Sequence, residues 1–454
     1  MPTYSARYIV NETSLLEDAS LEVSDGRVQE TSERPTAEET ALGDVAVAGG
    51  RVNAHSHAFQ RAIRGRTEYL DSQRADDDFW SWREKMYRAA LEFDADQFES
   101  VARFAFMEML RAGFTTVGEF HYVHHDRNGD PYDDPNELAK RLIRAADDVG
   151  IRIVLLRAAY HRAGYDTDPN PRQRRFIEPD VDTYLARVDD LRSFVDDFER
   201  ASVGLAPHSI RAVPRPWLEE IAGFASEHDL PVHIHASEQR GELQESIEEY
   251  GGTPIVAFSE MGLLGDNLTV VHATHASGLE IDLLAKHGCT VCACPTTERN
   301  LGDGFLPASE LVEHDVPICV GSDSHANIDP WEEMRLIEYH ERLLQEQRNV
   351  LATSRSTADA LWPMGGANGA RALHLEPATL EADSPADFVT VDLEHLSLAG
   401  SDADSIRPNL VFSIPPDAIR DVYLAGEPVI ENGRHPDQDS ITRDFRTALA
   451  DVWP

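Results

Sequence analysis

The first residues whose type and spacing could do chemistry are His55 and His57, which follow the apolar run 45–48 and the pair Gly49-Gly50. Side chains two positions apart in an extended chain point to the same side. Two imidazoles placed in this way can hold one metal ion if distant residues complete the coordination. An isolated His-x-His pair is more often two unrelated histidines at a polar strand end, so the rest of the chain decides.

Further residues of the right kind follow three later apolar runs. His235 ends one run, and Glu238 comes three positions later, within reach of anything that His235 binds. His272 ends a second run, and Asp323 follows a third, next to glycine and serine residues that allow close approach. Three imidazoles and one carboxylate are a suitable set for Zn²⁺ or Fe²⁺ together with a water molecule. The predicted metal ligands are His55, His57, His235 and Asp323.

The elements that must position these residues lie between positions 49 and 380, where short apolar runs alternate with helical stretches. Besides the run that ends at His55, strands are predicted at 115–120, 152–157, 201–206, 231–235, 268–272, 289–294 and 317–320. Helices are predicted at 96–112, 136–149, 217–228 and 330–352. Eight strand–helix units predict an α/β fold, a (β/α)8 barrel, whose functional residues gather at the carboxyl ends of the strands. The candidate residues all occupy such positions.

Both ends of the chain predict a second, smaller unit. Short β segments are predicted at 4–10, 45–48 and 387–392, with a hairpin at 422–430. These segments are too short and too polar to form a core alone. We therefore expect a small β-sandwich built from residues 1–48 and 381–454, beside a barrel that comprises residues 49–380.

The formal net charge of −40 excludes several partners. So acidic a chain is a poor ligand for nucleic acid or for an anionic membrane surface. No apolar run is long enough to span a bilayer, and the first residues lack a secretory pattern, so we expect a cytoplasmic protein. Lysine occurs only at Lys85, Lys140 and Lys286, and a lysine-poor acidic surface suggests adaptation to high salt.

The four cysteines are Cys289, Cys292, Cys294 and Cys319. One pair has Cys-x-x-Cys spacing, but no second pair matches it, which argues against a zinc cluster or a disulfide framework. They are predicted to be small buried side chains of the barrel strands.

The histidine and aspartate positions resemble those of the amidohydrolase superfamily. Its mononuclear deaminases carry His-x-His after the first strand, histidines after the fifth and sixth, and aspartate after the eighth. No lysine stands at the end of the fourth predicted strand, where binuclear members often have a carbamylated bridge, so one divalent ion is implied, zinc in preference to iron. Within the superfamily, the chain resembles the formimidoylglutamate deiminases at 53–62, 119–125, 206–211, 233–239, 272–275, 294–304 and 321–325.

This resemblance implies hydrolysis of N-formimino-L-glutamate to N-formyl-L-glutamate and ammonia, a step of histidine breakdown. The metal would supply hydroxide near neutral pH. Glu238 would carry the water proton to the departing nitrogen, because ammonia leaves poorly unless protonated. His272 would orient the hydroxide or stabilise developing charge, and Asp323 would be both a ligand and a proton acceptor.

The implied substrate has two carboxylates, so an acidic protein must hold a local positive cluster to bind it. Arg83 and Arg211 are the candidates, because a guanidinium group suits bidentate carboxylate binding. By resemblance, Gln60, Tyr122 and His208 complete substrate recognition. Superfamily members commonly form dimers, so a homodimer is expected.

Several alternatives stay open at this point. The same metal site could serve a deaminase of guanine or of an adenosine derivative, or a hydrolase that releases formamide instead of ammonia. A barrel without catalytic activity, used for assembly, is a further alternative. His121, His124 and His125 could line the pocket or bind a second ion.

Overall fold

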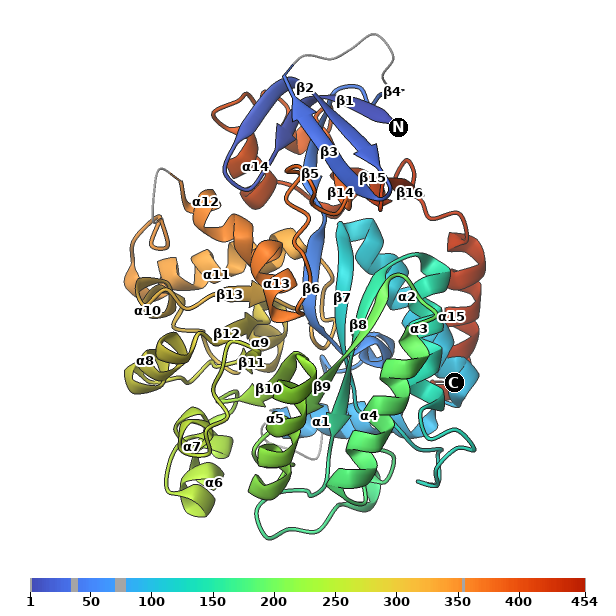
Figure 1. Cartoon of the computed structure of the whole chain (residues 1–454), viewed down its shortest axis with the longest axis vertical. Helices are drawn as coiled ribbons and strands as arrows, with labels where there is room; N and C mark the ends of the chain where they lie inside the picture. The colour runs from blue at the N-terminus through green and yellow to red at the C-terminus, as the bar shows by residue number, and fades with distance from the viewer. Residues whose placement is uncertain (1, 34–39, 70–78, 353–355, 454) are drawn as a thin grey trace.

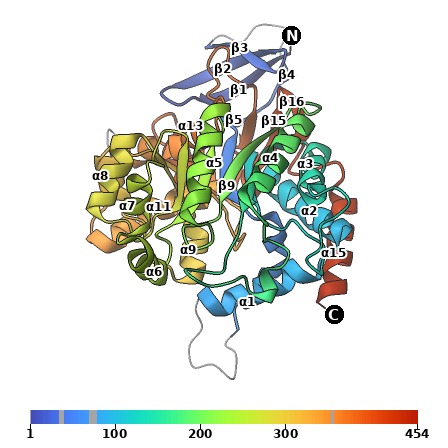
Figure 2. The same cartoon turned by 60° about the horizontal axis from the view of Figure 1, so that its bottom comes forward.

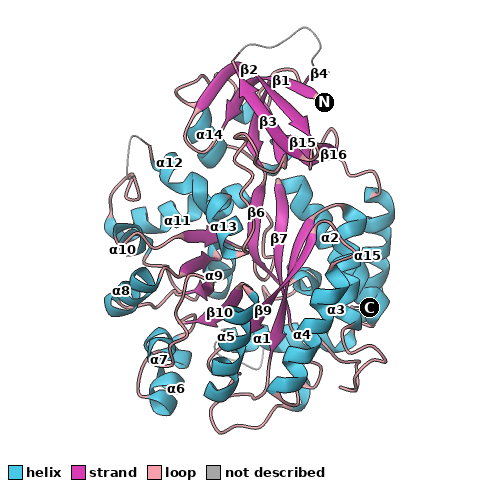
Figure 3. Cartoon of the chain, viewed as in Figure 1, coloured by secondary structure: helices cyan, strands magenta, loops and turns pink. Residues whose placement is uncertain are grey.

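Two β-sheets organise the protein, whose computed structural model describes residues 2–33, 40–69, 79–352 and 356–453 (Figure 1). One is a parallel sheet of eight strands, and the other is a mixed sheet built from both ends of the chain. Helices surround the parallel sheet, as the colouring in Figure 3 makes plain. No helix within the described ranges is long and apolar enough to cross a membrane.

The parallel sheet contains all eight predicted barrel strands, in sequence order. They are β6 (Arg51–Ser56), β7 (Phe114–His121), β8 (Arg152–Ala159), β9 (Ala201–Pro207), β10 (Val232–Ala236), β11 (Leu268–His272), β12 (Thr290–Ala293) and β13 (Ile318–Val320). The prediction of a (β/α)8 barrel is therefore confirmed. The four cysteines are buried and form no disulfide, as predicted.

Helices follow most of the strands and cover the barrel. The main ones are α2 (Ala95–Ala112), α3 (Glu137–Val149), α4 (Val181–Val195), α5 (Arg215–His228), α6 (Arg240–Tyr250), α7 (Pro254–Glu260), α8 (Gly278–His287), α9 (Pro295–Leu301), α10 (Ala308–Glu313), α11 (Pro330–Gln345) and α13 (Ala367–Ala372). The helix α1 (Phe79–Glu92) precedes α2, and α12 (Thr357–Leu361) precedes α13. Figure 2 shows α1 crossing below the barrel, on the side opposite the terminal sheet.

One predicted helix is shorter in the structure. The pattern predicted 330–352, but α11 ends at Gln345, and Glu346 adopts a left-handed conformation with φ of 54°. The buried Glu338 carboxylate accepts hydrogen bonds from the backbone N–H groups of Val350 and Leu351. These contacts turn the chain back on the helix, which periodicity alone does not reveal.

Closure of the barrel brings the first and last strands together next to the candidate site. Ser56 pairs with Asp323 in a parallel bridge. The N–H of Asp323 donates to the carbonyl of His55 at 3.0 Å, and the N–H of His57 donates to the carbonyl of Asp323 at 3.1 Å. A Cβ atom at Gly321 would lie 2.8 Å from that of His55, so this approach requires glycine.

The mixed sheet has the strand order β16-β15-β14-β5-β1-β2-β3, with β4 paired to β1. Its strands are β1 (Thr3–Val10), β2 (Leu15–Ser24), β3 (Arg27–Ser32), β4 (Thr40–Ala41), β5 (Val45–Gly49), β14 (Phe388–Asp392), β15 (Ile419–Leu424) and β16 (Glu427–Ile430). Both ends of the chain contribute, as predicted. β5 continues through Gly50 into barrel strand β6, so the two sheets are joined just before the His-x-His pair.

The C-terminal segment also reaches the barrel. After α14 (Ile406–Phe412) and the last strands, α15 (Gln438–Val452) lies against α2 (Figures 1 and 2). The rings of Phe104 and Phe445 stack there with centroids 3.9 Å apart.

Candidate active site

Four side chains from three strand ends converge at the mouth of the barrel. His55 Nε2 lies 3.2 Å from both His57 Nε2 and His235 Nε2, and Asp323 Oδ1 lies 3.5 Å from His55 Nε2 and 3.3 Å from His57 Nε2. Two adjacent ligand atoms on one divalent ion, each at a bond length of about 2.1 Å, are about 3.0 to 3.4 Å apart, and all four atoms lie within 4.8 Å of one another. The four atoms are therefore spaced as the donors of one divalent ion would be, and all four residues are buried.

The backbone sets the orientation of two of these imidazoles. His57 Nδ1 donates to the carbonyl of Phe120 at 2.8 Å, and His235 Nδ1 donates to the carbonyl of His208 at 2.8 Å. Because Nδ1 carries the proton, each Nε2 presents a lone pair to the shared point, as metal-binding histidines do. Burial lowers the pKa of His55 and His57 well below the ordinary value, which favours the neutral form that binds metal.

The loops at this face have unusual backbone conformations. Ser237, His272 and Asp323 have φ values of 56°, 73° and 44°, in the left-handed region that side chains other than glycine avoid. Such strained residues persist where the surrounding structure holds them, and they cluster at functional sites. The three lie at the ends of β10, β11 and β13, and the side chains of His272 and Asp323 face each other at 3.9 Å.

A second group of titratable side chains adjoins the four. His272 Nε2 lies 3.9 Å from Glu238 Oε1 and 3.9 Å from Asp323 Oδ2, while His272 Nδ1 lies 3.3 Å from Glu298 Oε1. Burial alone would lower the pKa of His272, but the three carboxylates outweigh it and raise that pKa to about 10. Burial raises the pKa of Glu238. A partly buried carboxyl group beside a histidine in a cleft is suited to proton transfer.

Two buried carboxylates support the site although they were not predicted to belong to it. Glu298 accepts the backbone N–H of Cys294 at 2.9 Å and holds His272 from behind. Glu119, at the end of β7, accepts the Ser56 hydroxyl at 2.5 Å and the N–H of Ala58 at 2.7 Å. Glu119 thereby fixes the chain on both sides of His57 through hydrogen bonds. A polar residue at a strand end was the available signal for Glu119, but nothing local singles out Glu298 in its helix.

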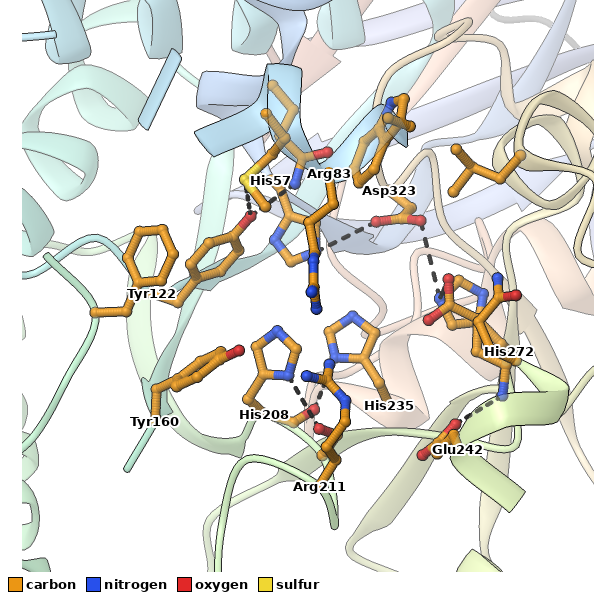
Figure 4. A pocket seen from close by; sticks show the side chains of 18 of the residues that line it. His57, Arg83, Tyr122, Tyr160, His208, Arg211, His235, Glu242, His272 and Asp323 are labelled. Atoms are coloured by element: carbon orange, nitrogen blue, oxygen red, sulfur yellow. Dashed lines mark hydrogen bonds and ion pairs between the residues drawn. The ribbon is translucent and has the colours of Figure 1, made fainter. Parts of the chain in front are cut away.

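The convergent group opens into one cavity of about 840 Å³, including its mouth (Figure 4). Glu238, His272 and Asp323 line it. So do all five residues predicted to bind substrate, which are Gln60, Arg83, Tyr122, His208 and Arg211. Figure 4 shows Arg83 and Arg211 entering from opposite sides toward His208 and His235. Lining residues beyond these predictions include Tyr87, Tyr160, Phe176 and Glu242.

The three histidines left open by the sequence do not line this cavity in the described part of the chain. His124 Nε2 lies 2.9 Å from the carbonyl of Ala158, and His125 Nε2 lies 2.8 Å from that of Ile177. His121 is buried against the ring of Phe98. These histidines therefore support the barrel wall behind the site.

A parallel barrel with clustered histidines and an aspartate at its carboxyl face is the architecture of a metal-dependent hydrolase. The profile described as "Amidohydrolase family" matches residues 46–429. The chain belongs to the amidohydrolase family and is an enzyme that hydrolyses C–N bonds.

Relatives and solved structures agree with this placement. The formimidoylglutamate deiminase of Pseudomonas aeruginosa is 37% identical over 90% of this chain and 89% of its own length. A 5-methylthioadenosine/S-adenosylhomocysteine deaminase of Haloarcula marismortui is 27% identical over 86% of this chain and 82% of its own. The crystal structure of an amidohydrolase from Brucella melitensis superposes with a TM-score of 0.93 at 33% identity, with both chains fully covered.

Proposed function

We propose that the protein deaminates N-formimino-L-glutamate, with water, to N-formyl-L-glutamate and ammonia, as a step of histidine breakdown. The observation that carries this proposal is the presence of two arginines, Arg83 and Arg211, in the cavity that opens onto the His/Asp group. Two guanidinium groups in one pocket of a chain with net charge −40 match the two carboxylates of this substrate. The similarity to the deiminase of Pseudomonas aeruginosa supports the same substrate.

One divalent ion would be held by His55, His57, His235 and Asp323, and we propose zinc. The spacing of the four donor atoms fits one shared divalent ion. A structurally similar adenosine deaminase from Xanthomonas campestris was crystallised with bound zinc. When bound, the ion supplies Lewis acidity, which makes water acidic enough to serve as the nucleophile near neutral pH.

Glu238 is the proposed proton carrier. Its carboxylate lines the cavity and lies 3.9 Å from His272 Nε2. It would take a proton from the attacking water and pass it to the leaving amidine nitrogen, and the second water proton would follow when the C=O bond forms and the C–N bond breaks, so that the nitrogen departs as ammonia. Burial raises the pKa of Glu238 toward neutral pH, where the carboxyl group can both accept and donate a proton.

His272 would orient the attacking water and stabilise the negative charge that develops on its oxygen. Its Nε2 faces both Glu238 and Asp323, and its Nδ1 is held by Glu298. With one nitrogen fixed in this way, the ring cannot rotate without losing a buried contact. A fixed N–H donor stabilises a developing oxyanion better than a mobile one.

Arg83 and Arg211 would bind the carboxylates, while His208, Tyr122 and Gln60 would shape the space between them and the reacting group. Gln60 Nε2 donates to the Tyr122 hydroxyl at 2.8 Å, which orients both side chains at the edge of the cavity. The His208 ring lies 4.9 Å from that of His235, centroid to centroid. The amidine of the substrate would therefore lie against the metal group, and the two carboxylates of the substrate would point outward.

The test is the product analysis of one reaction. N-formimino-L-glutamate is incubated with the zinc-loaded protein at high salt, with and without a chelator, and both ammonia and formamide are measured. Chelator-sensitive release of ammonia is expected. Release of formamide would contradict the proposed reaction, as would faster ammonia release from 5-methylthioadenosine, S-adenosylhomocysteine or guanine than from N-formimino-L-glutamate.

A further inference from the structure

The side of the cavity formed by α1 and the end of β8 contains two tyrosines that one buried amide holds together. Gln173 Nε2 lies 2.8 Å from the hydroxyl of Tyr160 and 3.2 Å from that of Tyr87. Gln173 ends the short 3-10 helix η2 (Pro171–Gln173) and is 1% exposed. Both tyrosines line the cavity, whereas the glutamine lies behind them.

The direction of these hydrogen bonds is determined by the other end of the amide. Gln173 Oε1 accepts the backbone N–H of Asn170 at 2.8 Å, so its NH₂ group must face the tyrosines. Both hydroxyl oxygens therefore accept from Gln173. In the described part of the chain, neither hydroxyl hydrogen is bonded to a protein acceptor, so both remain available to a ligand. Burial raises the pKa of Tyr87 to about 12, which keeps its proton in place.

The tyrosines lie beside a guanidinium group and away from the metal ligands. Arg83 and Tyr87 are four residues apart on α1, and the guanidinium carbon lies 5.6 Å from the centre of the Tyr87 ring. The Tyr160 ring lies 4.6 Å from the His208 ring, which in turn lies 4.9 Å from the His235 ring. The His208 ring thus lies between the Tyr160 ring and the metal ligand His235, as Figure 4 shows.

We propose that Tyr87, Tyr160 and Arg83 form a donor-only corner that binds the substrate carboxylate farther from the amidine, and that Gln173 is the residue that positions the two tyrosines as donors. This inference rests on the proposed function for the identity of the ligand. A corner that offers only hydrogen-bond donors accepts a carboxylate but leaves the NH₂ group of a neutral amide without a partner. The corner therefore selects glutamate derivatives over glutamine derivatives.

The test measures binding instead of turnover. Isothermal titration of the zinc-loaded protein with N-formyl-L-glutamate and with N-formyl-L-glutamine gives a ratio of two dissociation constants. The wild-type protein is expected to prefer the glutamate compound at least about tenfold, because hydrogen bonds to a charged acceptor are the stronger kind. In the double variant Tyr87→Phe/Tyr160→Phe this ratio is expected to fall toward one.

Gln173 is tested by a change that reverses its role. In Gln173→Glu the carboxylate would accept the tyrosine protons, so the hydroxyls would present lone pairs to the ligand and the preference is expected to shift toward the glutamine compound. Tyr165→Phe is the matched control, since Tyr165 is 49% exposed and does not line the cavity. It should retain the wild-type ratio.

Each result separates this inference from the proposed function. An unchanged ratio in the double variant, or a wild-type protein without the preference, overturns the donor-only corner. A wild-type protein that binds with the expected preference but releases no ammonia from N-formimino-L-glutamate supports the corner and refutes the proposed function. Circular dichroism and zinc content, measured for each variant, show that a changed ratio reflects the corner itself.

Discussion

The barrel contains two buried polar clusters that differ in how their groups are paired. In the wall, the Glu178 carboxylate accepts from Arg157 Nη1 at 2.5 Å and also pairs with Arg187, while Arg157 Nε donates to Asn136 at 3.0 Å. At the mouth, three imidazole nitrogens and one carboxylate oxygen lie within 4.8 Å of one another. In the wall, charges of opposite sign meet; at the mouth, lone pairs converge on a point.

The way in which the groups are paired distinguishes a structural cluster from a functional one. Burial does not, because Arg157, Glu178 and His55 are all fully buried. A cluster that pairs its own charges contributes to the fold and gains nothing from a ligand. A cluster of like acceptors repels itself until a cation binds, so it has a folding cost that only a ligand offsets. Four predictions test this distinction, from the largest expected effect to the smallest.

Removing one convergent donor should abolish function but leave the fold intact. We expect His235→Ala to lose the bound metal and to release ammonia at the background rate, because three donors remain in a group built for four. Metal analysis and circular dichroism check both parts. A variant that keeps a full equivalent of metal and substantial activity would show that His235 is not a ligand.

Changing the proton carrier should separate catalysis from metal binding. Glu238→Gln keeps the shape of the side chain and is expected to lower kcat about 10²- to 10⁴-fold, because proton transfer to the leaving nitrogen is lost. Its metal content should equal that of the wild type, since Glu238 lies outside the convergent group. Retained turnover would refute the role of Glu238.

The wall cluster should respond in the opposite way. Glu178→Gln leaves two arginines without their shared carboxylate, and we expect the free energy of unfolding to fall by about 3 to 5 kcal/mol. Metal content should not change. Glu219→Gln is the control, because Glu219 and Arg215 form an exposed pair whose loss should cost about 0 to 1 kcal/mol. Equal effects of the two variants in urea unfolding would contradict the distinction.

The surface provides the mildest test. With a net charge of −40, carboxylate repulsion is unscreened at low ionic strength, so the melting temperature should fall as salt is removed. The buried Glu178 pairs are shielded from salt, so Glu178→Gln should lower the melting temperature by a similar amount in low and in high salt. A wild-type melting temperature that is independent of salt would rule out adaptation of the surface to high salt.

Much of the fold could be predicted because its signals are local. Apolar runs between helical stretches located all eight barrel strands, and the residues at their ends identified the group that the structure brings together at the mouth. The boundary of α11 could not be predicted in this way, since the turn after Gln345 depends on the carboxylate of Glu338. Long-range contacts of this kind leave no periodic pattern.

The sequence by itself determined the strand–helix alternation and the residue types at the strand ends, because backbone periodicity and side-chain chemistry are properties of neighbouring residues. Only the tertiary structure decided which distant groups meet. The bridge between Ser56 and Asp323 joins the two ends of the barrel, and the amide of Gln173 donates to the hydroxyls of both Tyr87 and Tyr160. Both features depend on contacts between residues that are not neighbours in the chain. These contacts form only when the folded barrel brings the residues together.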